Sequence, residues 1–269
     1  MRKPTDFCML CQKEHSTKRN SHLIPKFLGN GIFEGSKPRQ GILINRYGRT
    51  SRIQDTFKED YILCDDCEKG ISIFETYCSL RLERFNNIRF CNQFKHNKIG
   101  NFEYVDCMDI NNKIFNLLIY SIIWRVSISQ KDEFGALKLN VADEENLRLK
   151  LNNFITKSQS ELFEKLDGFK HIPNHSHVLI RPNKKLRPPG SMLAVASNND
   201  FVHQLFIVDY LLFYITDSSL LVSEFKMIDN NMDRNTRLGI ANSERWKNFN
   251  KNTLRDYLKF DNFSRQIFI

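Results

Sequence analysis

Two cysteine pairs with the same spacing constrain this chain more than any other feature. Cys8 and Cys11 form the first Cys-x-x-Cys pair, and Cys64 and Cys67 form the second. Each pair puts two thiolates on one tight turn, and two such turns supply the four sulfur ligands that zinc takes in a tetrahedral structural site. The spacing therefore predicts a structural zinc ion held by these four cysteines. We expect this segment to fold poorly without the metal, because its apolar core is too small to stabilise it alone.

The start of the chain and its other cysteines favour a reducing compartment. No apolar signal segment separates Met1 from Cys8, and the longest apolar run, Ile114 to Ile123, is interrupted by polar residues. A membrane-spanning helix needs about 20 apolar residues. These features predict a cytoplasmic protein that does not enter a membrane, in which paired cysteines bind metal and do not form disulfides. Three cysteines without such spacing are expected to be small buried side chains: Cys78, Cys91 and Cys107.

The pattern of apolar residues predicts an α+β fold in two parts, residues 1–80 and residues 81–269. In the first part we expect a β-hairpin within 41–53, around a Tyr47-Gly48 turn, and a helix that starts near Asp65 and continues past Glu75. A hairpin between the cysteine pairs, and a helix after the second pair, predict a treble-clef zinc module. In the second part we expect a helical layer over 108–168, mainly strands of an antiparallel sheet over 176–225, and a terminal helix over 243–260.

Positive charge is concentrated in the part that carries the cysteines. The formal net charge is +9, and residues 1–100 hold 18 Lys and Arg against 11 Asp and Glu, whereas residues 101–269 hold 22 against 20. Such an excess is typical of a surface that faces nucleic acid. Arginines crowd the predicted hairpin, where they could contact phosphates or simply protect a strand edge from aggregation. We favour phosphate contact by these four residues: Arg39, Arg46, Arg49 and Arg52.

Three short motifs in a fixed order resemble a known nuclease family. They are Cys8-Met-Leu-Cys11, then Ser21-His22-Leu23-Ile24-Pro25, then Ile62-Leu63-Cys64-Asp-Asp-Cys67-Glu68. This order resembles the zinc-bearing HNH (ββα-metal) endonucleases over the first 75–80 residues. The resemblance implies hydrolysis of DNA phosphodiesters with His22 as the general base. It also implies one catalytic Mg²⁺ or Mn²⁺ ion, distinct from the zinc. Zinc-HNH modules fused to unfamiliar domains resemble effectors of bacterial defence against phage, which implies an antiviral role.

The chain departs from the family pattern at three places. Ser21 stands where the family has an Asp, Glu or His metal ligand, and Glu68 stands where it has His or Asn. Glu59 and Asp60 lie where the family has Asn. The carboxylate of Glu68 suits Mg²⁺, but an acidic residue there also stabilises a helix start.

Two functions therefore stay open. One is a nuclease with a catalytic site of Ser21, His22 and Glu68. The alternative is a catalytically degenerate, zinc-scaffolded subunit of a larger complex, which binds nucleic acid or a partner protein. The apolar character of the predicted sheet also allows a homodimer through the second part of the chain.

Several other polar residues have structural interpretations. Trp124-Arg125 lies in an apolar helical run, which predicts packing and a buried ion pair for the arginine. Glu75 follows Glu68 by seven residues on the same helical face and is expected to form a solvated salt bridge. His175-Ser-His177 is expected to supply surface histidines beside a strand.

Overall fold

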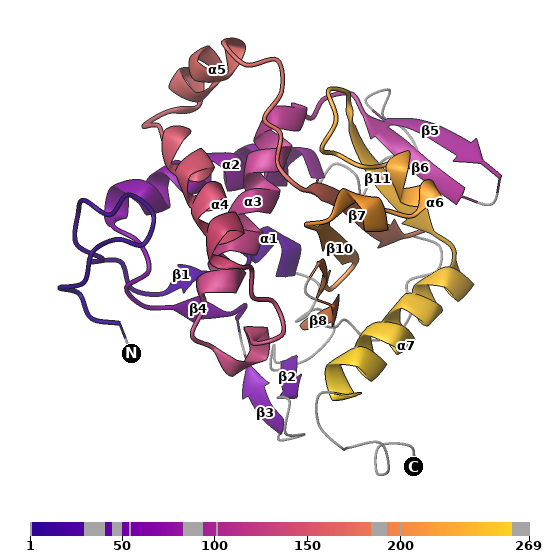
Figure 1. The fold of residues 1–269 in the computed structure, drawn as a ribbon, viewed down its shortest axis with the longest axis horizontal. Helices are drawn as coiled ribbons and strands as arrows, with labels where there is room; N and C mark the ends of the chain where they lie inside the picture. The colour runs from indigo at the N-terminus through magenta and orange to yellow at the C-terminus, as the bar shows by residue number, and fades with distance from the viewer. Residues whose placement is uncertain are drawn as a thin grey trace.

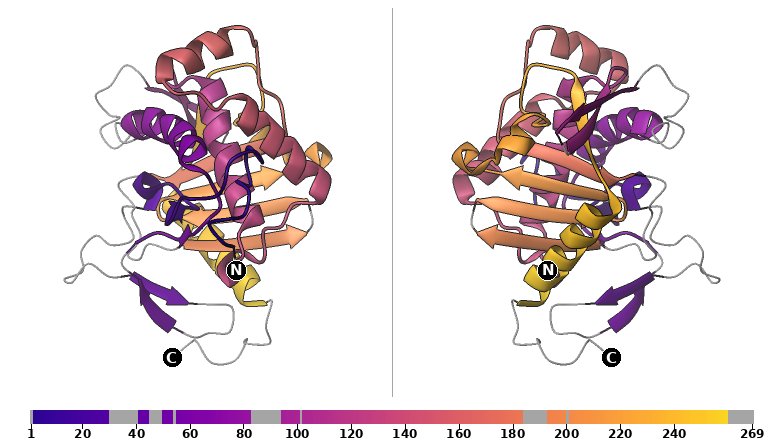
Figure 2. Two further views of the ribbon diagram at one scale, coloured as in Figure 1. Left: turned by 90° about the vertical axis from the view of Figure 1, so that its left-hand side faces the viewer. Right: turned by 90° about the vertical axis from the view of Figure 1, so that its right-hand side faces the viewer.

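A computed structural model describes residues 2–29, 41–44, 50–53, 55–82, 94–100, 102–183, 193–199 and 201–259. The described chain has three layers around a seven-stranded sheet (Figure 1). The N-terminal segment and a set of helices cover one face of the sheet, and the last long helix crosses the other face (Figure 2). The fold is thus α+β, as the sequence predicts.

The N-terminal segment contains two small antiparallel ribbons and a long helix. Strand β1 (Ser21–His22) pairs with β4 (Lys58–Glu59), and β2 (Gly41–Ile44) pairs with β3 (Thr50–Ile53). The short helix α1 (Lys26–Gly29) follows β1. Helix α2 (Asp65–Leu82) begins with the second cysteine pair. The predicted hairpin strands and the predicted helix are confirmed, while the expected Tyr47-Gly48 turn lies outside the described residues.

The helical layer consists of α3 (Asn112–Ile128), α4 (Val141–Asn153) and α5 (Gln159–Asp167). Each helix begins after a polar residue whose side chain accepts a hydrogen bond from a main-chain N–H of the first turn. These N-cap residues are Asn111, Asn140 and Ser158. In α3 every residue from Ile114 to Ile128 is buried, because the helix lies between the N-terminal segment and the sheet. The layer confirms the helices predicted within 108–168.

The described residues within 176–225 form four strands whose neighbouring pairs are antiparallel, as predicted, but these strands belong to a larger sheet that is mixed. Its order is β5-β6-β11-β7-β10-β9-β8, and β11 runs parallel to β7 while all other neighbours are antiparallel. The strands are β5 (Phe94–Ile99), β6 (Phe102–Cys107), β7 (Ser176–Pro182), β8 (Leu193–Asn199), β9 (Val202–Ile207), β10 (Tyr210–Ile215) and β11 (Thr236–Ala241).

Strands β5, β6 and β11 were not expected from the sequence. Strand β5 is a polar edge strand, in which Lys and His replace the alternating apolar residues of a central strand. Strand β11 is short and is interrupted by Gly239. Between β10 and β11 the chain forms a 3-10 turn (Ser218–Leu220) and the short helix α6 (Ser223–Lys226). These elements carry the chain back so that β11 inserts between β6 and β7.

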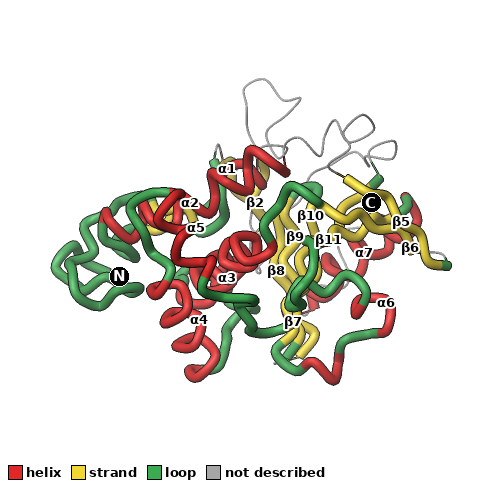
Figure 3. The backbone as a smooth tube through the Cα atoms, turned by 90° about the horizontal axis from the view of Figure 1, so that it is seen from above, coloured by secondary structure: helices red, strands yellow, loops and turns green. Residues whose placement is uncertain are grey.

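Each face of the sheet buries its own apolar cluster. In β10, Leu212 and Tyr214 face the helical layer, whereas Leu211 and Phe213 face the opposite side. There they pack with Trp246 of α7 (Ser243–Lys259), which confirms the predicted terminal helix. Figure 3 shows the sheet between α3 and α4 on one side and α6 and α7 on the other.

The larger cluster continues from the sheet into the N-terminal segment. Leu10, Leu23 and Phe74 belong to the same buried cluster as Leu117 of α3 and Leu179 of β7. Apolar packing therefore crosses residue 80 without interruption. Among the described helices, none has both the length and the apolar character needed to span a membrane.

Candidate metal centre and histidine site

The two cysteine pairs lie on neighbouring turns that hydrogen bonds hold together. In the first turn Gln12 donates its main-chain N–H to the Cys8 carbonyl at 2.9 Å and adopts a left-handed φ of 56°. The main-chain N–H of Met9 donates to the Ile62 carbonyl at 2.9 Å, which ties the first turn to the segment before the second pair. The second pair opens α2, where the N–H of Glu68 donates to the Cys64 carbonyl.

The four cysteine sulfurs converge on one point. All lie within 4.8 Å of one another, and the Sγ atoms of Cys11 and Cys64 are 3.9 Å apart. A tetrahedral zinc ion with Zn–S bonds of about 2.3 Å would set its sulfurs about 3.8 Å apart. A hydrogen bond from the Cys67 thiol lowers the pKa of Cys8 to about 5, so a thiolate is already favoured in the cluster. The four predicted ligands therefore form a site that can hold a metal ion such as zinc.

His22 lies on the β1–β4 ribbon, beside the start of α2. Ser21 pairs with Glu59 and His22 pairs with Lys58 across the ribbon. The main-chain N–H of Asn20, which has a left-handed φ of 56°, donates to the carboxylate of Asp60 at 2.7 Å and fixes the entry to the strand. The side chain of His22 is 27% exposed, so it is accessible while its main chain is held.

The three residues that the nuclease motif singles out share an unusual property. Within the described part of the chain, Ser21 Oγ, His22 Nε2 and Glu68 Oε2 are buried and have no hydrogen-bond partner. A buried polar atom without a partner costs about 1–3 kcal/mol, and native proteins contain few of them. His22 and Glu68 are close enough for the charge of Glu68 to act on the ring of His22, so their unpaired atoms fit a site that is completed by a ligand, an ion or water.

Burial favours the neutral form of the His22 ring, and a carboxylate lies beside it. Burial lowers the pKa of His22, and the cation of Lys58 lowers it further. Asp55 Oδ1 is 3.8 Å from His22 Nε2, and Asp55 Oδ2 is 2.6 Å from Lys58 Nζ. Burial alone would raise the pKa of Asp55, but hydrogen bonds from Lys58 and from the main chain of Thr56 lower it. The site thus combines a neutral imidazole with an ionised carboxylate.

An arginine of helix α3 contacts the main chain of His22. Arg125 is 1% exposed, and its guanidinium donates to the His22 carbonyl at 2.5 Å and to Glu75 Oε1 at 2.6 Å. The buried ion pair predicted for Arg125 is confirmed, and its partner is Glu75, which was expected to be solvated. Burial raises the pKa of Glu75, the charge of Arg125 opposes this, and the charge of Glu68 adds to it.

Sequence reasoning missed the roles of Asp55 and Arg125 in this site. Glu59 and Asp60 lie in the sequence where the nuclease family has Asn, but in the structure Glu59 accepts a hydrogen bond from Ser129 Oγ at 2.6 Å. The signal for Asp55 was its place three residues before Lys58, which is the partner of His22 in the ribbon. Finding it required the strand register, which two residues of β4 are too few to reveal from sequence.

The structure describes only part of the predicted nucleic-acid surface. Arg52 lies in β3 and is exposed, while Arg39, Arg46 and Arg49 lie outside the described residues. The cysteines without a paired spacing, Cys78 and Cys107, are buried as expected, and Cys91 lies outside the described residues.

The expectation of two surface histidines in β7 and its flank is wrong for one of them. His177 is fully buried, because alternation along β7 turns it toward the helical layer. His175 lies partly exposed, 2.9 Å from the carboxylate of Asp143.

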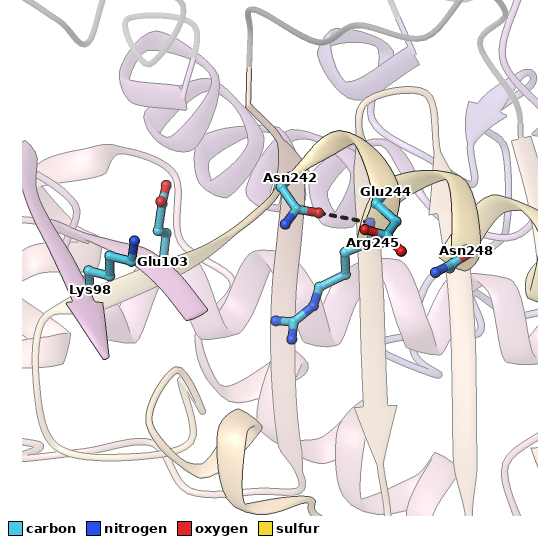
Figure 4. A pocket seen from close by; sticks show the side chains of 6 residues that line it. All are labelled: Lys98, Glu103, Asn242, Glu244, Arg245 and Asn248. Atoms are coloured by element: carbon cyan, nitrogen blue, oxygen red, sulfur yellow. Dashed lines mark hydrogen bonds between the residues drawn. The ribbon is translucent and has the colours of Figure 1, made fainter. Parts of the chain in front are cut away.

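A separate polar pocket of about 390 Å³ lies at the other end of the sheet (Figure 4). Lys98 and Glu103 of the β5–β6 hairpin form one side of it, and the start of α7 forms the other. There Asn242 accepts a hydrogen bond from the main chain of Arg245 at 2.9 Å. None of the residues predicted for a site lines this pocket.

Comparison with known proteins returns no relative. No family model matches the chain, and neither a curated protein nor a solved structure matches it. The resemblance to zinc-bearing HNH endonucleases therefore depends on the sequence motifs, of which the structure bears out the cluster of four cysteines.

Proposed function

We propose that this chain is a metal-dependent, HNH-like nuclease that hydrolyses phosphodiester bonds in DNA, with a structural zinc ion held by its four cysteines. One observation carries the proposal. The three side chains that the motif assigns to catalysis, Ser21, His22 and Glu68, each bury a polar atom that has no hydrogen-bond partner among the described residues. A stable protein retains such atoms together where they serve a ligand, because each one otherwise only lowers stability.

In this proposal His22 accepts the proton of the attacking water. A ring whose pKa lies below its ordinary value is neutral at pH 7, so it can act as a base. At 3.8 Å the carboxylate of Asp55 is too far for a direct hydrogen bond to Nε2, and it stabilises the imidazolium that forms on proton transfer. Lys58 keeps Asp55 ionised.

Glu68 and Ser21 are the residues that would hold a catalytic Mg²⁺ or Mn²⁺ ion beside His22. Both offer oxygen atoms, which these ions prefer, and the bound ion would stabilise charge on the phosphate and on the leaving oxygen. In the described ranges, the cysteine quartet is the only group of three or more Cys, His, Asp or Glu ligand atoms that converge closely. Mg²⁺ commonly keeps several water ligands, so a few protein oxygens suffice.

The test is cleavage of supercoiled plasmid with Mg²⁺ or Mn²⁺ by the zinc-loaded protein. The His22→Ala variant should lose roughly 10²–10⁴-fold in rate, which is the usual contribution of a general base. His96→Ala is the matched control, because His96 is exposed on the edge strand β5. Equal cleavage by wild type and His22→Ala, or no cleavage by either, would contradict the proposal.

A non-catalytic nucleic-acid-binding subunit is the second candidate. It is favoured by Ser21, which is a weak metal ligand, and by the exposed Arg52 on the β2–β3 hairpin. Under this alternative, DNA binding would be salt-sensitive, would survive His22→Ala and would weaken in Arg52→Ala. A stable complex with a partner protein or a second copy of the chain would point to the scaffold role instead.

A further inference from the structure

We propose that Arg125 of the helical layer is a positioning residue that sets the distance between His22 and Glu68. The inference deepens the proposed nuclease function and rests on it. Arg125 lies in the last turn of α3, outside the segment that resembles the nuclease family. The proposal makes the second part of the chain a component of the site rather than an attached domain.

The guanidinium bridges the two elements that carry the proposed site residues. Its Nη1 donates to the carbonyl of His22 on β1, and its Nη2 donates to Glu75 on α2. Glu75 is seven residues after Glu68, which is two helical turns along the same face of α2. One planar side chain therefore fixes the strand of His22 against the helix of Glu68.

Arg125 is itself held in a single orientation. Its Nε donates to the Ser121 carbonyl at 3.0 Å, one turn earlier in α3, and its Nη2 is 3.3 Å from Ser121 Oγ. The side chain is almost completely buried. A rigid fork with two fixed donors can hold two partners at a defined separation, which the point charge of a lysine cannot do.

The ribbon has other anchors, so Arg125 is not needed merely to attach it. On the β4 side, Glu59 accepts hydrogen bonds from Ser129 Oγ at 2.6 Å and from the main chain of Gln130 at 3.2 Å. Arg2 pairs with Glu59 and also donates to the Ile128 carbonyl at 2.6 Å. These contacts hold β4 at the end of α3, whereas Arg125 acts on β1, the strand that carries His22.

The experiment compares Arg125→Lys with Arg237→Lys in the zinc-loaded full chain. Arg237 makes a similar fork far from the site, with Nε donating to Asp106 and Nη1 to the Met227 carbonyl. Loss of a residue that orients a metal or catalytic ligand typically costs 10–100-fold in affinity or activity. We expect Arg125→Lys to lower kcat for plasmid nicking and the affinity for Mn²⁺, measured by calorimetry, by roughly this factor while KM stays unchanged. Arg237→Lys should change neither quantity.

Glu75→Gln is the second variant, and it tests the positioning role of Arg125 if Arg125→Lys does not fold. The amide keeps the size of Glu75 but weakens the α2 half of the bridge, so kcat and Mn²⁺ affinity should fall severalfold. Wild-type kcat and Mn²⁺ affinity in folded Arg125→Lys, or in Glu75→Gln where Arg125→Lys does not fold, would overturn the positioning role. Equal losses in Arg125→Lys and Arg237→Lys would do the same. If wild type binds Mn²⁺ beside His22 but does not cleave, the nuclease proposal fails. If Arg125→Lys still weakens that binding, the positioning role survives.

Discussion

Helix α3 contacts a histidine near each of its ends, and the two histidines have opposite surroundings. Near the start of the helix, Asn116 places its side-chain amide 3.1 Å from Nε2 of His177. Near the other end, Arg125 binds the main chain of His22 and leaves its ring untouched. His177 is fully buried, with an acceptor oxygen beside each ring nitrogen, whereas His22 is partly exposed and its Nε2 has no hydrogen-bond partner in the described structure.

Under the proposed function, the difference separates a polar network that stabilises the fold from one that serves a ligand. Around His177 the network is closed: Asp229 accepts hydrogen bonds from Ser176 Oγ at 2.9 Å and from the main chain of His177 at 3.1 Å. A closed network recovers the cost of burying its polar groups. Around His22 the buried polar atoms have no hydrogen-bond partner in the described structure, and each lowers the stability of the fold. This is expected of a site in which a bound ligand supplies the missing contacts.

Removing the metal from the cysteine cluster should have the largest effect. It should abolish amide protection around His22, at one end of α3, and leave much of the protection around His177, at the other end. Structural zinc sites contribute about 10–16 kcal/mol in isolated zinc-finger peptides. In Cys67→Ser we expect loss of bound zinc and loss of amide protection in residues 2–29 and 55–82, measured by hydrogen exchange. Protection around His177 should persist longer, because the sheet has a second apolar cluster that includes no residue of these segments.

Cys78→Ala is the control for the cysteine substitution. Cys78 lies on the same helix as Cys67 and is fully buried but does not belong to the metal cluster. It should keep a full complement of zinc. Full amide protection of residues 2–29 in zinc-free Cys67→Ser would refute the dependence of the His22 end on the metal.

Acid should lower the stability of the protein mainly by protonating His177, whose surroundings form the closed network. Burial lowers the pKa of His177 to about 4 from its ordinary 6.5, with the charge of His171 lowering it and that of Asp229 opposing. Below pH 6.5 His177 is protonated in the unfolded chain but stays neutral in the folded chain. The free energy of unfolding therefore falls as the pH drops from about 6.5 to about 4. The loss should total about 3 kcal/mol. Urea unfolding at pH 7 and pH 4.5 measures it.

The variant His177→Gln should flatten this pH dependence, at the price of lower stability at pH 7. The ring of His22 also has a lowered pKa, but it is partly exposed, so His22→Gln should change the slope less. An identical pH slope in wild type and His177→Gln would show that other groups control the acid response.

Glu68→Gln should have opposite effects on stability and on ligand binding at the site around His22. Without a divalent ion the change removes a partly buried negative charge that repels Glu75, so the free energy of unfolding should rise by about 1 kcal/mol. With Mn²⁺ at 100 times its Kd, wild type should gain about 2.7 kcal/mol, and Glu68→Gln should gain much less. Thermal unfolding with and without Mn²⁺ measures both effects. Asp66→Asn, an exposed position in the same helical turn, should respond to Mn²⁺ as wild type does.

The parts of the molecule that sequence predicts well are those set by local spacing. The Cys-x-x-Cys pairs indicate the metal cluster directly, and apolar periodicity indicates α2, α3 and α7. The parts it misses depend on long-range pairing. Asp55 reaches His22 only through the register of a two-residue ribbon, and Arg125 reaches it from a helix about 100 residues later. Strand β11 became visible only as the neighbour of β6 and β7, because Gly239 weakens its alternation.

Two buried serines offer the finest test of the comparison between closed and open sites. Both Ser16 and Ser21 are completely buried, but Ser16 Oγ donates to the Phe7 carbonyl at 3.2 Å, whereas Ser21 Oγ has no partner in the described structure. Removing a satisfied hydroxyl should lower the free energy of unfolding by about 1 kcal/mol, so Ser16→Ala should destabilise the protein. Removing an unsatisfied one should leave stability unchanged or raise it by up to about 1 kcal/mol in Ser21→Ala.

Urea unfolding of the zinc-loaded variants, in buffer without Mg²⁺ or Mn²⁺, resolves a difference of this size. Addition of Mn²⁺ should then reverse the order for Ser21, because wild type gains a ligand bond that Ser21→Ala lacks. Equal destabilisation by the two substitutions in metal-free buffer would mean that the hydroxyl of Ser21 already has a partner in the folded protein. The polar groups around His22 would then be as fully hydrogen-bonded as those around His177. They would no longer support a ligand-binding site.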